Sequence, residues 1–197
     1  MKRWIVLAAM LAGGFRVWGE EPAGDKADGW RLLLSNTEME NWAPCRGDEK
    51  SEPWSLENGV YRGFGSTVGY KDALVDFVLE CEFLFDGKGD GGIGLRASRT
   101  APKAASIGYE LDIGMAPDKK QGRIRFPANP KPDPGSATFA SGEWHSLRIE
   151  AKGPHVTVQL DGKQVLEFSD VGYLQGQLCL RSDEDGVKFR NLRLKLL

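Results

Sequence analysis

The sequence predicts an all-β protein, folded as an antiparallel sandwich of two sheets. Short segments in which apolar and polar residues alternate follow one another along the chain, and turns rich in glycine separate them. No stretch shows a helical period. The 25 glycines among 197 residues suit many tight turns, and a chain of this length supports one substantial domain with its own core.

The first residues are predicted to lie outside this fold. Lys2 and Arg3 precede an apolar stretch, and Val17-Trp18-Gly19 is an acceptable small-residue cleavage site. The chain is therefore divided into a signal peptide at 1–19, a flexible leader at 20–28 and a single domain at 29–197. We expect a periplasmic or secreted protein. A retained N-terminal anchor is the alternative, although the apolar stretch is too short to span a bilayer.

About ten strands are expected from Gly29 onward. The segment "WSLENGVYRG" is predicted to be a hairpin, because Asn58-Gly59 can supply the two positive φ angles of a type I′ turn. The segment "VTVQLDGKQVLEF" is predicted to turn in the same way at Asp161-Gly162. The remaining strands are "FVLECEFLF", "GDGGIGLRAS", "GYELDIG", "GRIRF", "WHSLRIEAKG", "GQLCLRS" and "VKFRNLRLKLL", the last expected near "GWRLLLS". Two long irregular segments, 97–107 and 127–143, are either functional loops or disordered decoration.

Charge and cysteine content exclude several classes of protein. Loss of residues 1–19 removes three basic residues and no acid, which moves the formal charge from −2 to −5. A mildly acidic domain has no basic stripe for nucleic acid or anionic lipid. The chain has three cysteines, an odd number for an oxidising compartment. Cys81 is expected to be an inert buried thiol, and a bridge from Cys45 to Cys81 or Cys179 stays open.

Charged side chains are predicted to share one face of three consecutive strands. In "GYELDIG" Glu110 and Asp112 point to the same side, because side chains alternate along a strand. Hairpin order favours pairing with "GGIGLR" and "GRIRF", which place Arg96, Arg123 and Arg125 on that side. Such alternation of acids and bases would make the neighbouring like charges tolerable.

Two glycines on the same face extend this prediction. Gly92 and Gly94 would leave space above the sheet where other side chains would stand. An acid–base array above a glycine floor indicates a polar ligand groove. The alternative is a solvated face with cross-strand ion pairs worth a few tenths of a kcal/mol each.

The chain resembles the 3-keto-disaccharide hydrolase domain family, also described as 3-keto-glucoside 1,2-lyase and hydratase. The resemblance covers roughly residues 29–197 and implies a concanavalin A-like jelly roll of the lectin and glucanase type. It rests on the order and spacing of "GWRLLLSN", "NW" at 41–42, "WSLENGVYRG", "YKDALVDFVLECEF", "GDGGIGLRA", "GYELDI", "GEWHSLRIEAKG", "VQLDGKQV" and "VKFRNLRLKLL". This chain departs from the family pattern at Asp90-Gly91-Gly92 (usually Asn-Ser-Gly), at Asp112 (usually Gln) and at Trp144-His145 (usually Trp-Asn).

The resemblance implies an exported, carbohydrate-active domain that cleaves 3-keto-glycosides. The ketone acidifies the C2 proton, a base removes it, the C1 oxygen leaves by β-elimination, and water then adds. Glu110 is the candidate base, and Asp112 is a second acid or, with Glu110, a ligand of a divalent metal. Arg96 is the candidate clamp on the 3-oxo group. Arg123, Arg125 and His145 complete the candidate substrate-binding set, with a structural imidazole as the other interpretation of His145.

Two other interpretations remain at this stage. β-Glucanases on the same fold carry Glu-x-Asp-x-(x)-Glu on one strand, but here the third position is Gly114 or Met115, and neither can protonate a leaving group. A non-catalytic carbohydrate-binding or interaction module is the alternative from a different class. In each case the expected partner is an oligosaccharide or glycoside.

Overall fold

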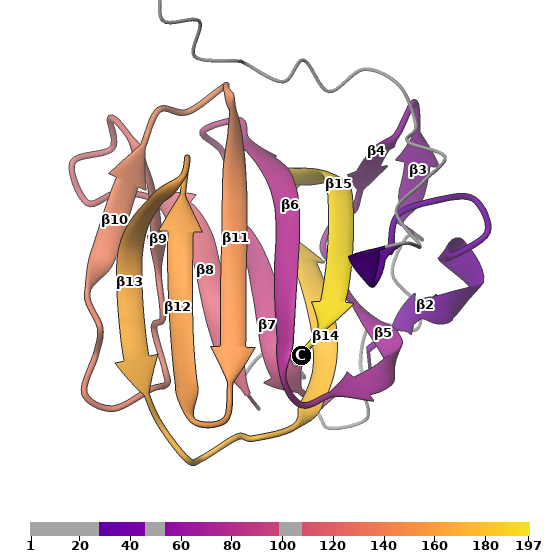
Figure 1. The fold of residues 1–197 in the computed structure, drawn as a ribbon. Coiled ribbons are helices and arrows are strands. Elements are labelled where there is room, and N and C mark those ends of the chain that lie inside the picture. The colour runs from indigo at the N-terminus through magenta and orange to yellow at the C-terminus, as the bar shows by residue number, and fades with distance from the viewer. Residues whose placement is uncertain (1–27, 46–53, 99–107) are drawn as a thin grey trace, which may run out of the picture.

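Two antiparallel sheets pack face to face in the computed structural model, which describes residues 28–45, 54–98 and 108–197 (Figure 1). The predicted all-β sandwich is confirmed. A short 3-10 helix, η2 (Met39–Asn41), precedes strand β2. The predicted signal peptide and almost all of the leader lie outside the described residues.

The eight-stranded sheet has the order β13-β12-β11-β6-β15-β4-β3, and β1 pairs with the free half of β15. Its strands are β1 (Trp30–Leu32), β3 (Ser55–Glu57), β4 (Val60–Arg62), β6 (Phe77–Phe85), β11 (Trp144–Lys152), β12 (His155–Leu160), β13 (Lys163–Ser169) and β15 (Val187–Leu196). The expected pairing of the two ends of the domain is thus found, with Trp30 opposite Lys195.

The seven-stranded sheet has the order β10-β9-β8-β7-β14-β5-β2. Its strands are β2 (Trp42–Pro44), β5 (Ser66–Leu74), β7 (Gly91–Ala97), β8 (Tyr109–Met115), β9 (Gly122–Arg125), β10 (Ser136–Phe139) and β14 (Gly176–Ser182). The segment 127–143, expected to be irregular, contains the edge strand β10, which pairs with β9 through four residues. The prolines in the first half of this segment indicated an irregular structure, so the short strand in its second half was missed.

Turn chemistry fixes the hairpins where the sequence placed them. Asn58 and Gly59 have φ angles of 51° and 75°, and they join β3 to β4. Asp161 and Gly162 have φ angles of 50° and 77°, and they join β12 to β13. Both pairs thus supply the two positive φ angles of a type I′ turn, whose twist matches the twist of the flanking strands.

Alternation along the strands builds one core between the two sheets. On β6, Phe77 and every second residue after it are buried, whereas Glu80 and Glu82 are partly exposed on the outer face. On β8 the inward residues are Tyr109, Leu111 and Ile113, each at most 1% exposed. Within the described ranges, no helix is long and apolar enough to span a bilayer.

Candidate active site

The three central strands of the polar face are neighbours, in the order β9-β8-β7. Asp112 on β8 lies opposite Arg125 on β9 and opposite Gly92 on β7. Glu110 lies opposite Gly94. The paired carboxylates of β8 therefore stand on the outer face of the seven-stranded sheet, beside the short stretch of β7 that contains the two glycines.

The cation that these carboxylates meet is Arg181, on β14. Its Nε donates to Glu110 Oε1 at 2.8 Å and its Nη2 to Asp112 Oδ1 at 3.0 Å. Its Nη1 donates to Asp90 Oδ1 at 2.6 Å and to Asp183 Oδ2 at 2.5 Å. One guanidinium thus binds four carboxylates, two from β8 and two from the turns beside β7 and β14, and we call these five residues the Arg181 cluster.

Gly92 explains how Arg181 reaches β8. Arg181 lies opposite Gly92, which in turn lies opposite Asp112, so the guanidinium must cross β7 above Gly92. A Cβ atom at Gly92 would come within 2.4 Å of the carbonyl oxygen of Leu111. The space that the sequence assigned to a ligand above Gly92 is therefore used by the side chain of Arg181. Above Gly94, a Cβ atom would meet the side chain of Cys179 at 3.1 Å.

Burial shifts the titration of the two acids on β8. The side chains of Glu110 and Asp112 are only 16% and 14% exposed. Loss of hydration raises the pKa of Glu110 and of Asp112, and the positive charge of Arg181 opposes that rise without cancelling it. A carboxylate with a raised pKa and a fixed orientation is a suitable general base.

Asp90 and Asp183 form a second pair at the rim of the cluster. Both accept from the same nitrogen of Arg181, and the amide of Asp183 donates to the carbonyl oxygen of Asp90 at 2.7 Å. Partial burial and a hydrogen bond with Asp90 raise the pKa of Asp183 to about 6, while Asp183 and Arg181 lower the pKa of Asp90. Both side chains are nearly half exposed, so a proton held by Asp183 is accessible to a ligand.

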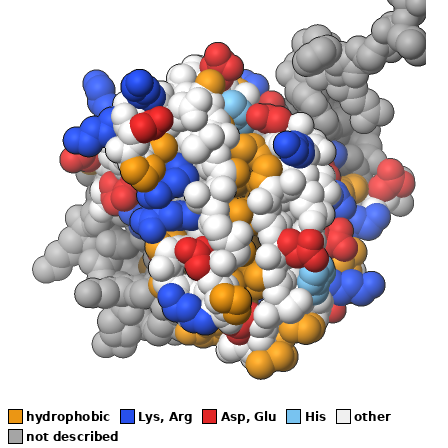
Figure 2. All heavy atoms as spheres, turned by 90° about the vertical axis from the view of Figure 1, so that its left-hand side faces the viewer, with side chains coloured by type: hydrophobic (Ala, Val, Ile, Leu, Met, Phe, Trp, Pro, Cys, Tyr) orange, Lys and Arg blue, Asp and Glu red, His pale blue; other side chains and the backbone are white. Residues whose placement is uncertain are grey.

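Arg125 is the second cation of this face. Its Nε lies 3.5 Å from Asp112 Oδ2, and the side chain is 40% exposed. That nitrogen is buried and has no hydrogen-bond partner among the described residues. Arg123 lies opposite Gly114, farther along β9. β9 neighbours the edge strand β10, and Figure 2 shows Lys and Arg side chains gathered beside this edge of the molecule, next to acidic ones.

Arg96 is not on this face, contrary to the prediction. A β-bulge shifts the register between β7 and β14, and Arg96 adopts a φ of 50°. Its side chain therefore leaves the alternation and is fully buried, donating to the carbonyl oxygens of Val75, Gly153 and Tyr173 at 2.7–3.2 Å. An ion pair with Asp76 at 3.3 Å completes its contacts. Arg96 joins turns at one end of the sandwich, and it cannot clamp a substrate beside Glu110.

His145 is also remote from the Arg181 cluster, and its contacts are those of a structural imidazole. It lies on β11 of the other sheet, packs against Phe83 and Phe139, and is 7% exposed. Its Nδ1 lies 2.8 Å from Asp161 Oδ2, and its Nε2 lies 2.8 Å from the carbonyl oxygen of Ala140. Both ring nitrogens are thus used to join strand β11 to neighbouring turns.

The predicted metal site is not formed by Glu110 and Asp112 as they stand. Arg181 occupies the position between the two carboxylates that a divalent cation would take. No group of three or more metal-ligating side chains is arranged to hold an ion within the described part of the chain. From the sequence, either an arginine or a metal ion could supply the positive charge beside the two acids. In the structure the guanidinium of Arg181 supplies it.

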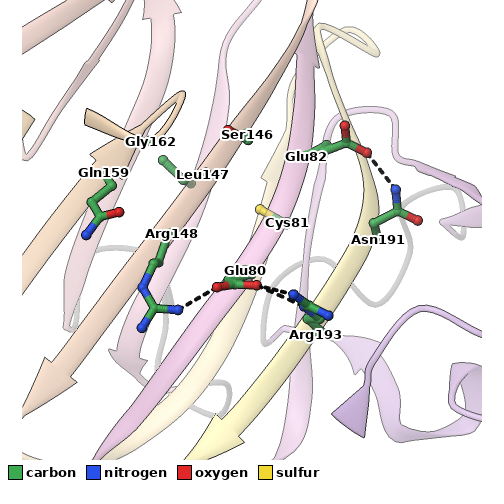
Figure 3. Close-up of a pocket in the computed structure, with 10 residues that line it drawn as sticks. All are labelled: Glu80, Cys81, Glu82, Ser146, Leu147, Arg148, Gln159, Gly162, Asn191 and Arg193. Atoms are coloured by element: carbon green, nitrogen blue, oxygen red, sulfur yellow. Dashed lines mark hydrogen bonds and ion pairs between the residues drawn. The ribbon is translucent and has the colours of Figure 1, made fainter. Parts of the chain in front are cut away.

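A hollow of about 240 Å³ lies on the outer face of the eight-stranded sheet, away from the Arg181 cluster (Figure 3). Glu80 lies in it between Arg148 and Arg193, at 2.5 and 2.6 Å, and Asn191 donates to Glu82 at 2.6 Å. These polar groups are bound to one another across the strands, and none of the predicted site residues lines the hollow. We therefore place the candidate active site on the Arg181 cluster.

Sequence reasoning missed Arg181, Asp90 and Asp183. Alternation in "GQLCLRS" does place Arg181 on an outer face, but nothing local shows that β14 pairs with β7. Asp90 was visible as a departure from the family pattern, as was Asp112, and both contact Arg181. Asp90 also stands beside Gly114, because a Cβ atom added to that glycine would lie 3.3 Å from the Cβ of Asp90. A third acid thus lies near the place where β-glucanases carry one on the strand itself.

Comparisons with known proteins agree with this fold. A family described as a 3-keto-alpha-glucoside-1,2-lyase-like domain matches residues 29–195. A candidate glycosyl hydrolase from Parabacteroides distasonis has a TM-score of 0.66 at 17% identity, covering 88% of this chain and 96% of that one. A carbohydrate-binding module from Bacillus subtilis has a TM-score of 0.58 at 19% identity, covering 79% and 95%.

A lichenase from a mouse hindgut metagenome has a TM-score of 0.54 at 10% identity, covering 85% of this chain and 97% of that one. At these identities the solved structures show a common fold, the jelly-roll sandwich, and not a common activity. A search of curated protein sequences finds no match.

Proposed function

This chain belongs to the family of 3-keto-alpha-glucoside-1,2-lyase-like domains, and from that premise we propose that the Arg181 cluster cleaves 3-keto-glycosides. The observation that carries the proposal is the environment of Glu110. It is a largely buried carboxylate whose pKa is raised by lost hydration, held at 2.8 Å from a fixed guanidinium. We also propose that the protein is exported, on the basis of the basic and apolar segments at its N-terminus.

Glu110 would act as the base in the first step. A ketone at C3 acidifies the C2 proton, because the electron pair left behind delocalises into the ketone. When the Glu110 carboxylate takes this proton, an enolate forms and the C1–O bond then breaks by β-elimination. Water adds to the resulting unsaturated ketone, so that one water is consumed and the 3-keto sugar and the free alcohol are released.

Arg125 and Asp183 suit the other two roles. The guanidinium-bearing side chain of Arg125 is 40% exposed, so it can bind the developing negative charge on the 3-oxo group in place of Arg96. Asp183, with a pKa of about 6, can hold a proton near neutral pH and donate it to the departing oxygen. The base Glu110 and the acid Asp183 thus bind the same guanidinium, and their different surroundings set their pKa values.

The test is turnover of defined disaccharides. Purified protein is incubated with 3-keto-trehalose and 3-keto-lactose, with and without EDTA, and with the parent disaccharides as controls. We expect free sugar to be released from the keto substrates alone, and Glu110→Gln to lower the rate by about 10²-fold or more. Release from the parent disaccharides would instead indicate direct glycoside hydrolysis by the carboxylates around Arg181.

One observation favours a binding module as the second candidate. Each of the four acids of the cluster is already hydrogen-bonded to Arg181, an arrangement that also suits a rigid polar surface for sugar hydroxyls. Calorimetric titration with the same disaccharides separates the two. Binding without turnover of either keto substrate, abolished by Arg125→Met, would establish the module.

A further inference from the structure

We propose that Cys45 and Cys179 form a disulfide that fastens the edge strand β2 to β14, the strand that carries Arg181. The Sγ atoms of these residues lie 3.8 Å apart, in van der Waals contact, in the present dithiol structure. The two residues are 134 positions apart in the sequence, so their meeting is a product of the fold.

The surroundings of the two sulfurs are built around this contact. Cys45 and Cys179 are each 1% exposed and form a small apolar cluster with Ala97, separate from the main core. Cys179 lies opposite Gly69 on β5 and opposite Gly94 on β7, so glycines flank it on both neighbouring strands. Neither glycine has a side chain that would separate the sulfurs or cover the approach of Cys45.

Bond formation needs a small movement at one end. The S–S distance must fall from 3.8 Å to about 2.05 Å. Cys45 directly follows β2, a strand of three residues at the edge of its sheet, and its amide donates to the carbonyl oxygen of Thr67 at 2.9 Å. The end of a short edge strand can shift more easily than β14, which is paired on both sides.

The chemistry is thiol–disulfide exchange with an oxidised low-molecular-weight disulfide or an oxidised dithiol protein. One cysteine thiolate attacks the oxidant and releases one thiolate from it, and the second cysteine then attacks the mixed disulfide and releases the other. Two protein thiols are oxidised and one disulfide of the oxidant is reduced to two thiols. Because both sulfurs are buried in the folded protein, the exchange takes place as the chain folds.

The third cysteine provides an internal control. Cys81 lies on β6 in the other sheet and belongs to the main core, whereas Cys45 and Cys179 share a separate cluster. It is therefore expected to stay reduced under conditions that oxidise the other two. Oxidised protein should accordingly contain one thiol out of three.

The experiment refolds the full chain in a buffer of reduced and oxidised glutathione, followed by alkylation in denaturant and intact mass measurement. We expect one alkyl group, at Cys81, and a cross-linked peptide containing Cys45 and Cys179. The oxidised protein should melt about 5–15 °C above the same protein treated with a reductant, because the bond closes a loop of more than a hundred residues.

Two matched variants decide the assignment. Cys45→Ala should abolish the difference in melting temperature between the oxidised and reduced forms, whereas Cys81→Ala should preserve it. Three alkyl groups on natively refolded protein, a bridge that includes Cys81, or an unchanged difference in the Cys45→Ala variant would each overturn the proposal.

Discussion

Replacing Arg181 with methionine tests whether one guanidinium holds the polar face together. The change keeps an apolar stem of similar length and removes the charge. Four carboxylates then face one another, with Arg125 as the cation at 3.5 Å from one of them. The side chains of Arg181, Glu110 and Asp112 are all less than 20% exposed, so water can replace the lost hydrogen bonds only in part.

The expected loss is about 3–5 kcal/mol of unfolding free energy at pH 7, the range for removing one partner of a buried ion pair. For a domain of this size this corresponds to a fall in melting temperature of roughly 6–20 °C. Calorimetry or urea unfolding measures it directly. The control is Arg125→Met, whose partly exposed side chain makes one longer contact and should cost about 1 kcal/mol or less.

The pH dependence of this loss provides the sharper check. Burial already raises the pKa of Glu110 and Asp112, and Arg181 opposes the rise, so its removal raises both pKa values further. A raised folded-state pKa means that stability is retained at low pH and lost as pH rises through that value. The destabilisation should therefore shrink as pH falls through these raised pKa values, and it should be smallest below about pH 4, where the carboxyls gain protons in the unfolded chain as well. A loss below about 1 kcal/mol at pH 7, or an equal loss at acid and neutral pH, would refute the reasoning.

Three further predictions test separate parts of the same structure. Glu110→Gln should reduce turnover of a 3-keto-glucoside by about 10²-fold with little change in the urea midpoint of unfolding. The control is Leu111→Ala, on the buried side of the same strand, which should lower the free energy of unfolding by about 2–5 kcal/mol. Unfolding of the Glu110→Gln protein would mark Glu110 as structural. Arg96→Met should lower the free energy of unfolding by about 2–4 kcal/mol, because it leaves buried carbonyl oxygens without their hydrogen-bond donor. The turnover of the folded protein should stay unchanged. A selective rise in KM would instead indicate that Arg96 contacts the substrate. Asp183 has a folded-state pKa of about 6 against an ordinary value of 3.8, so its stabilising contribution is complete below pH 3.8 and is lost as pH rises through 6. The free energy of unfolding of the Asp183→Asn variant, measured across this range, should lack that decline. A parallel decline in the variant and the unaltered protein would exclude this carboxyl as its source.

Local patterns in the sequence were enough to predict the sheets and much of the polar face. Alternation is a local property, so it correctly placed Leu111 and Ile113 inside and Glu110 and Asp112 outside. The turn residues Asn58-Gly59 and Asp161-Gly162 fixed two hairpins, because their positive φ angles admit few other structures. Hairpin order predicted the neighbours of β8, since consecutive strands tend to pair.

Only the folded structure identifies the cation that binds Glu110 and Asp112. Arg181 is 71 residues away from Glu110, and the pairing of β14 with β7 that joins them leaves no local signal in either strand. Arg96 was misplaced because a bulge with one left-handed residue breaks the alternation on which its prediction depended. Local periodicity sets the side to which a residue points, whereas long-range strand pairing and its irregularities set what that residue touches.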